Sequence, residues 1–137
     1  MDTTSFDYSS AITAHLVYFG IAIVATVLFV AIYVMVTPHR EFTLIRQGNV
    51  AASISLGGAL LGYIIPLAKA ISQSESIGDM LLWSGVALVA QLVAYFVSRL
   101  LVPALSNDVH EGKVASGIFV AAMSIGIGLL NAAAMTE

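Results

Sequence analysis

The chain has 137 residues, which is enough for one domain. Hydrophobic residues make up 59% of it and charged residues only 9%, whereas a soluble domain carries about 25% charged residues because its surface meets water. The formal net charge of −3 gives no strong attraction to nucleic acid, and the absence of cysteine excludes disulfides and thiolate chemistry. We therefore expect a single membrane domain over residues 1–137 that is surrounded by lipid and binds no nucleic acid.

Four apolar stretches are long enough to cross a bilayer, which requires about 20 residues in a helix. None of them contains Asp or Glu, and none shows the alternating pattern of a membrane-spanning strand. The segment before the first stretch lacks the positive region of a signal peptide, so we expect that stretch to be retained. The predicted fold is an all-α membrane protein with four transmembrane helices. The predicted spans are Ala14–Val36, Val50–Ile71, Met80–Leu101 and Val114–Met135.

The positive charges near the span ends are unevenly distributed between the two sides. Arg40 and Arg46 follow the first span, and Arg99 and Lys113 flank the loop after the third span. The opposite side has only Lys69. Because Lys and Arg concentrate in cytoplasmic loops, we expect both of these loops to be cytoplasmic and both termini to lie on the outer side of the membrane.

The loop after the first span reads "TPHREFTLIRQG", from Thr37 to Gly48. Pro38 suits the first turn of a helix and Gly48 suits its C-terminal end. Phe42 and Ile45 are three residues apart and can enter the membrane interface together. This pattern predicts a short interfacial helix, and an ordinary surface linker is the alternative.

The two halves of the chain resemble each other. "GNVAASI" at Gly48–Ile54 recurs as "GKVASGI" at Gly112–Ile118, 64 residues later, and "YFGIAIVAT" at Tyr18–Thr26 matches "WSGVALVAQ" at Trp83–Gln91. Because Ala and Gly are common in spans, chance similarity is the alternative to duplication. Duplicated two-span units enter the membrane in the same sense, which predicts two parallel-repeat hairpins packed as a pseudo-twofold bundle. The expected units are residues 14–71 and 80–135.

Small residues recur at steps of three and four along the second and fourth spans. Such stripes let helices approach closely in lipid, where no hydrophobic effect drives their association. We expect these two spans to form a tight centre, with the bulkier first and third spans facing lipid. Packing within one chain, a self-association face and the lining of a pore are the open interpretations. The stripes are Ala51, Ser55, Gly58, Gly62 and Pro66 in the second span, and Gly117, Ala121, Ser124, Gly128 and Asn131 in the fourth.

Polar residues at membrane depth need partners, because burying an unpaired amide costs on the order of a few kcal/mol. Gln91 lies near the middle of the third span, so we expect its side chain to bond a neighbouring helix, with a permeation contact as the alternative. Asn131 lies near the outer end of the fourth span and can bridge helices or form an outward-facing polar site. Asn49 and Glu111 precede the second and fourth spans, where capping roles are expected.

The sequence contains no pattern of a hydrolase, a metalloprotease or a metal-binding cluster. We therefore expect no enzymatic activity, no catalytic residue, no cofactor and no metal site. The absence of a carboxylate within the first span argues against proton-coupled export, and it leaves an uncoupled channel as an alternative.

Three segments resemble the uncharacterised bacterial inner-membrane proteins of the YjfL type, domain of unknown function 350. They are "LIRQGNVAASISLGGALLGYIIPLAKAI" at Leu44–Ile71, "QL" at Gln91–Leu92 and "GLLNAAAM" at Gly128–Met135. The resemblance covers residues 18–135 and implies a multi-pass protein of the bacterial inner membrane with a doubled two-span unit. In such a membrane the two termini, expected on the outer side, would be periplasmic. It implies no established activity.

Two functional hypotheses follow. The first is a self-assembling scaffold or accessory component of a membrane-associated system, with lipid, further copies of the chain and a cytoplasmic protein as partners. The second is a small channel or uncoupled transporter lined by small and polar residues. Candidate residues for the cytoplasmic partner loop are Arg40, Arg46 and Glu111. Candidate intramembrane polar and packing positions are Gln91, Asn131, Asn49, Ser55, Gly58, Gly62, Ser124 and Gly128.

Overall fold

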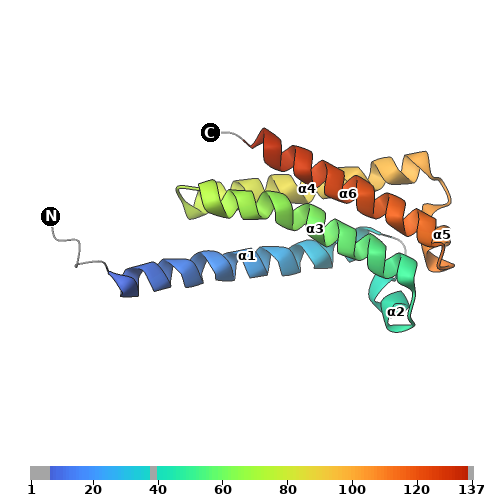
Figure 1. Cartoon of the computed structure of the whole chain (residues 1–137), viewed down its shortest axis with the longest axis horizontal. Coiled ribbons are helices and arrows are strands. Elements are labelled where there is room, and N and C mark those ends of the chain that lie inside the picture. The colour runs from blue at the N-terminus through green and yellow to red at the C-terminus, as the bar shows by residue number, and fades with distance from the viewer. Residues whose placement is uncertain (1–6, 38–39, 136–137) are drawn as a thin grey trace.

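The computed structural model describes residues 7–37 and 40–135. In this part of the chain, four long helices run along the bundle and two short helices lie at one end of it (Figure 1). The long helices are apolar enough to cross a membrane, which confirms the four predicted spans. The long helices are α1 (Tyr8–Val36), α3 (Val50–Gln73), α4 (Ile77–Leu101) and α6 (Val114–Ala134), and the short ones are α2 (Glu41–Arg46) and α5 (Leu105–His110).

Two of the spans begin earlier than their apolar stretches, because polar side chains cap the helices. The Asp7 carboxylate accepts a hydrogen bond from the backbone N–H of Ser10 at 3.1 Å and starts α1 six residues before the predicted span. The Ser76 hydroxyl accepts from the N–H of Asp79 at 3.1 Å and starts α4. Side chains that accept hydrogen bonds from the unpaired N–H groups of the first turn determine where a helix begins. These capping residues are polar, so a hydropathy pattern does not identify them.

The closest helix pair is α3 and α6, which lie along each other through their small residues (Figure 1). A Cβ atom added to Gly128 would overlap the backbone of Gly62, and one added to Gly58 would overlap Ala121. A Cβ on Gly62 would overlap the backbone of Ser124. The two backbones therefore touch with no side chain between them. The predicted tight centre is confirmed, and the glycines of both stripes create it.

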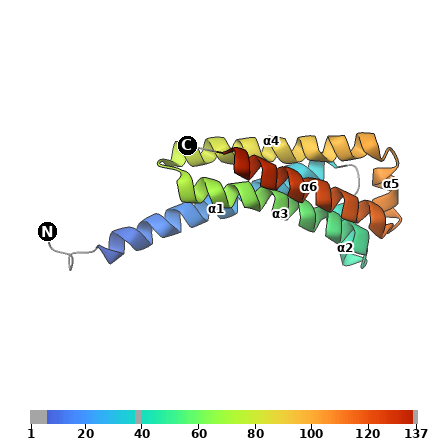
Figure 2. The ribbon, with the colours of Figure 1, turned by 45° about the horizontal axis from the view of Figure 1, so that its top comes forward.

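Helix α4 packs against both central helices along one face, and its opposite face is exposed (Figure 2). The expectation that the third span faces lipid therefore holds for one side of the helix only, since 33% of its most apolar stretch is buried. The reason is that small side chains recur along this span as well, so that α4 can approach α3 and α6 closely. The buried positions of α4 are Met80, Ser84, Ala87, Gln91, Ala94, Tyr95 and Ser98.

Helix α1 is the peripheral span, and most of its surface is exposed, as predicted. Its N-terminal part leans away from the other helices in both views (Figures 1 and 2). Aromatic contacts hold its C-terminal part against the bundle. The ring of Phe29 stacks on Tyr63 of α3 at a centroid distance of 4.3 Å, and Tyr33 meets the edge of Tyr95 of α4 at 5.9 Å. Ala22 and the partly buried Tyr18 and Ile21 also pack against the core, so the contact of α1 with the bundle extends from Tyr18 to Tyr33.

The end of the bundle that carries α2, α5 and their connecting turns, residues 40–49 and 102–113, is called the loop end below. The predicted short helix is present as α2, and Gly48 ends it at a φ of +83°, where glycine is favoured. Pro38 lies outside the described residues. The second short helix, α5, was not predicted. It is followed by Gly112 at a φ of +80° and then by α6, and its bounds fall 64 residues after those of α2. The internal duplication stays a prediction.

Replacing Gly62 by alanine is expected to destabilise the protein by about 1–3 kcal/mol, the usual cost of inserting a methyl group into a filled contact. The new Cβ would lie 2.7 Å from the carbonyl carbon of Ser124. Thermal or denaturant unfolding in detergent micelles measures the change. Gly57→Ala is the matched control, since the space beside Gly57 is open and alanine favours a helix. Equal destabilisation by both substitutions would contradict the close contact between α3 and α6.

Candidate functional site

Gln91 lies where α3, α4 and α6 meet, and its side chain is fully buried. Its Nε2 donates a hydrogen bond to the backbone carbonyl of Ser124 on α6 at 3.1 Å. The same nitrogen would lie 2.8 Å from a Cβ on Gly62, so the absence of a side chain there makes room for the amide. A helix carbonyl can accept this second bond through its free lone pair. The prediction that Gln91 bonds a neighbouring helix is confirmed.

Four of the predicted candidate residues each have a buried polar atom without a hydrogen-bond partner in the described part of the chain: Gln91 Oε1, Ser124 Oγ, Ser55 Oγ and Asn131 Nδ2. The first two lie together at the junction of the three helices. Ser55 lies seven residues before Gly62 on α3, about 10 Å towards the loop end, and Asn131 lies equally far beyond Ser124 on α6. The structure therefore brings Gln91 and Ser124 together and leaves Ser55 and Asn131 apart from them.

At the loop end, Asn49 joins the start of α3 to the end of α5. Its Oδ1 accepts a hydrogen bond from the N–H of Ala52 at 2.9 Å, which confirms the predicted cap. Its Nδ2 donates to the carbonyls of Val109 at 2.9 Å and His110 at 3.2 Å. A single side chain thus satisfies a helix N-terminus and two carbonyls at a helix C-terminus, the groups that a helix leaves unpaired at its ends.

Glu111 does not cap α6, which corrects the expectation for this residue. The N-cap position of α6 is Lys113, and Glu111 instead follows the last turn of α5. The amine of Lys113 lies 3.3 Å from the Asp108 carboxylate and 3.5 Å from that of Glu111. Asp108, through its hydrogen bond and its charge, and Glu111 to a lesser extent raise the pKa of Lys113 above its ordinary value. Asp108 also accepts a hydrogen bond from the Ser116 hydroxyl at 3.0 Å.

The three residues predicted for a partner loop are exposed at the same end of the bundle: Arg40 and Arg46 beside α2, and Glu111 beside α5. Between the two loops lies a shallow cavity of about 430 Å³. Its polar lining includes Gln47, Asn49, His110 and Glu111.

A buried residue with a carboxyl group was not among the predicted candidates. Glu41, at the start of α2, is only 1% exposed, and its Oε1 lies 2.7 Å from the Thr37 hydroxyl oxygen. A carboxylate in a loop between spans is ordinarily solvated, so its position along the chain did not single it out. The shift of 64 residues pairs it with Leu105, which is an apolar residue and is fully buried. That pairing is the signal that could have identified Glu41 as an inward-facing position.

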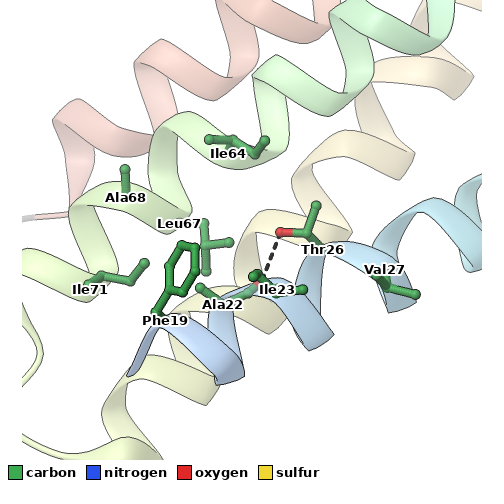
Figure 3. Close-up of a pocket in the computed structure, with 9 residues that line it drawn as sticks. All are labelled: Phe19, Ala22, Ile23, Thr26, Val27, Ile64, Leu67, Ala68 and Ile71. Atoms are coloured by element: carbon green, nitrogen blue, oxygen red, sulfur yellow. Dashed lines mark hydrogen bonds between the residues drawn. The ribbon is translucent and has the colours of Figure 1, made fainter. Parts of the chain in front are cut away.

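A groove of about 350 Å³ separates the outer part of α1 from α3 (Figure 3). Its one polar side chain, Thr26, donates a hydrogen bond to the carbonyl of Ala22 in its own helix at 2.8 Å, so the hydroxyl is satisfied. The groove therefore offers only apolar contact. It is lined by Phe19, Ala22, Ile23, Thr26 and Val27 of α1 and by Ile64, Leu67, Ala68 and Ile71 of α3.

No cluster of three or more His, Asp or Glu side chains that could hold a metal occurs within residues 7–37 and 40–135. In this same part of the chain, the functional candidates are thus the helix junction at Gln91, the loop end and the groove beside α1.

A family model described as Domain of Unknown Function (DUF350) matches residues 7–135. The chain is 42% identical over 119 residues to the UPF0719 inner membrane protein YjfL of Escherichia coli (strain K12), covering 87% of this chain and 90% of that protein. It is 28% identical over 118 residues to the UPF0719 transmembrane protein YshE of Bacillus subtilis (strain 168), covering 85% and 88%. No solved structure matches the chain.

Replacing Asn49 by alanine is expected to cost roughly 0.5–2 kcal/mol of unfolding free energy through the lost cap of α3. It should also loosen the contact between α5 and the start of α3, because the carbonyls of Val109 and His110 lose the hydrogen bonds that Asn49 donates. Asn49→Asp keeps the accepting oxygen and removes the donor, so it should release α5 and spare the cap. Hydrogen exchange of the α5 amides together with unfolding measurements separates the two effects. If both variants leave the exchange of α5 unchanged, Asn49 does not join the two loops.

Proposed function

This chain belongs to the family described as Domain of Unknown Function (DUF350), and we propose that it acts as a self-assembling scaffold of the inner membrane. Its four apolar spans make it a multi-pass membrane protein, and its relatives include a named inner membrane protein. The observation that carries the proposal is the closed contact between α3 and α6.

A closed centre supports a scaffold rather than a conduit for solutes. Where Gly58, Gly62 and Gly128 bring the two backbones into contact, no space is left between α3 and α6. The Gln91 amide, which is fully buried, is held by its bond to the backbone carbonyl of Ser124. A solute moving through this junction would have to separate the two helices. The rigid unit formed by α3, α4 and α6 is instead suited to holding a fixed shape in the membrane.

The surface around α1 supports self-association. Helices already in lipid associate through close packing and not through the hydrophobic effect, so a groove that admits a helix offers more contact than a flat face. The groove beside α1 is apolar, and α1 leans away from the bundle over this same part of its length (Figures 1 and 3). We infer that a second copy of the chain packs against this face.

We propose in addition that this scaffold binds a cytoplasmic protein through its loop end. Arg40 and Arg46 are exposed there, and Glu111 lies on the neighbouring loop. We expect this end to face the cytoplasm, because Lys and Arg are in excess near it. Asn49 bridges the two loops, so they would meet a partner as one surface.

Cysteine cross-linking in bilayers tests the self-association face, because the natural chain contains no cysteine. A cysteine at Ile23, which lines the groove and is 48% exposed, is expected to form disulfide-linked dimers. A cysteine at Val89, which is 60% exposed on the outer face of α4, is the control and should cross-link far less.

Self-assembly through α1 would be contradicted if the Ile23 and Val89 variants cross-linked to the same extent. It would also be contradicted if single-molecule counting in lipid found only monomers. The dimer fraction should rise with the protein-to-lipid ratio, as mass action requires of an association.

A small channel is the second candidate, and one observation favours it: Gln91 Oε1, Ser55 Oγ and Ser124 Oγ are buried without hydrogen-bond partners among the described residues. Polar atoms at membrane depth often mark an ion or substrate path. Such a path would require the helix junction to open during permeation.

Replacing Gln91 by leucine separates the two functions. In a scaffold, the wild-type protein passes no ion in liposomes, and the substitution lowers stability by about 0.6–2 kcal/mol through the lost interhelical hydrogen bond. In a channel, the wild-type protein shows a flux that the substitution removes without lowering the melting temperature. Fluorescent flux assays and thermal unfolding of the same preparations give both quantities.

A further inference from the structure

Arg99 lies on the exposed face of α4, two residues before the helix ends at Leu101. It forms no ion pair and no side-chain hydrogen bond with any described residue. The ion pairs among the described residues instead join Lys113 to Asp108 and Glu111. The guanidinium of Arg99 is therefore a cation without a carboxylate in contact with it in the described part of the chain.

The exposed side chains around Arg99 on α4 are apolar. Phe96 is 48% exposed, Leu100 is 80% exposed and Leu101 is 64% exposed. Because Leu100 and Leu101 follow Arg99 along the helix, the apolar surface continues past the arginine towards the loop end. A long cationic side chain near the end of a span extends to the headgroup level of the bilayer. The anions that the guanidinium meets at that level are the phosphates of lipids.

An open cavity of about 350 Å³ lies beside Arg99, and it is lined by Phe96, Arg99, Leu100 and Pro103. Apart from the guanidinium, these side chains are apolar. An ordered water molecule needs several polar partners, and this lining offers only one polar side chain. The cavity is therefore better suited to an apolar group than to water, and it places that group directly beside a cation.

The composition of the lining also favours one charge type of lipid headgroup. A guanidinium presents a planar set of N–H donors that can give two parallel hydrogen bonds to a phosphate. None of the four lining residues has a carboxylate or another acceptor side chain that could bind an ammonium group. An anionic headgroup is therefore favoured over a zwitterionic one, whose amine would find no partner in this lining.

We propose that Arg99, Phe96, Leu100 and Pro103 form a binding site for an anionic phospholipid in the leaflet at the loop end. The guanidinium of Arg99 binds the phosphate, and the three apolar side chains contact the glycerol and the upper part of an acyl chain. This site lies on the lipid-facing side of α4. It does not depend on whether the chain self-associates or binds a cytoplasmic protein.

A cation in the last turn of a helix is favourable even without a ligand, because the C-terminal carbonyls carry partial negative charge. That effect changes the stability of α4 and gives no preference between lipids. The experiment must therefore measure lipid binding itself.

Native mass spectrometry of the full-length protein tests the proposal, after incubation in detergent micelles with equal amounts of phosphatidylglycerol and phosphatidylethanolamine that have the same acyl chains. The wild-type protein is expected to retain more phosphatidylglycerol. Arg99→Gln should lower the affinity for phosphatidylglycerol about 5-fold, the effect of one basic residue near an anionic membrane surface. Arg46→Gln removes the same charge from an exposed arginine of α2, so it is the matched control and should keep the preference.

Two further measurements separate the phosphate contact from the acyl-chain contact. Phe96→Ala removes apolar surface and no charge, so it should weaken the binding of both lipids to the same extent. Excess glycerol phosphate has the phosphate and no acyl chain, so it should leave the bound phosphatidylglycerol in place.

The proposal is overturned if the wild-type protein shows no preference between the two lipids, or if Arg99→Gln and Arg46→Gln reduce the preference equally. Displacement of the lipid by glycerol phosphate would also overturn it, since the site would then take a soluble phosphate. Because Arg99 is exposed, the melting temperature of Arg99→Gln without added lipid should equal that of the wild-type protein.

Discussion

The backbone contact between α3 and α6 is the interaction on which the rest of the bundle depends. In lipid, apolar side chains gain little by leaving one hydrocarbon surface for another, so helices associate where they fit closely or share hydrogen bonds. The glycines at positions 58, 62 and 128 allow that fit. The same missing side chain at Gly62 makes room for the Gln91 amide, so that α4 is held against the central pair by its hydrogen bond to Ser124.

Helix α1 contacts the bundle in a different way from the other three spans. It meets the bundle through aromatic rings near its C-terminal end, and its outer part is separated from α3 by an apolar groove. Helix α1 is thus the most exposed of the four spans, on the outside of the unit formed by α3, α4 and α6.

The sequence predicted what depends on composition and local spacing. Runs of about 20 apolar residues gave the four spans, the small-residue stripes gave the α3–α6 contact, and the isolated amide of Gln91 gave an interhelical hydrogen bond. What it did not predict depends on tertiary neighbours or on capping. Asp7 extends α1 beyond its apolar stretch, and Glu41 looked like an ordinary loop carboxylate because burial is decided by the helices around it. The buried face of α4 was not predicted because large side chains dominate the composition of this span. The small residues that allow close packing, such as Ala87 and Ala94, were therefore overlooked.

Solid-state NMR of the full-length protein in bilayers, with carbon-13 at the glycine α-carbons, tests the central contact most directly. The account predicts a cross-peak between the α-carbons of Gly62 and Gly128 that survives Gly57→Ala and disappears in Gly128→Ala. Absence of that cross-peak in the wild-type protein, with the remaining glycine signals assigned, would show that the two backbones do not touch and would contradict the arrangement of the bundle.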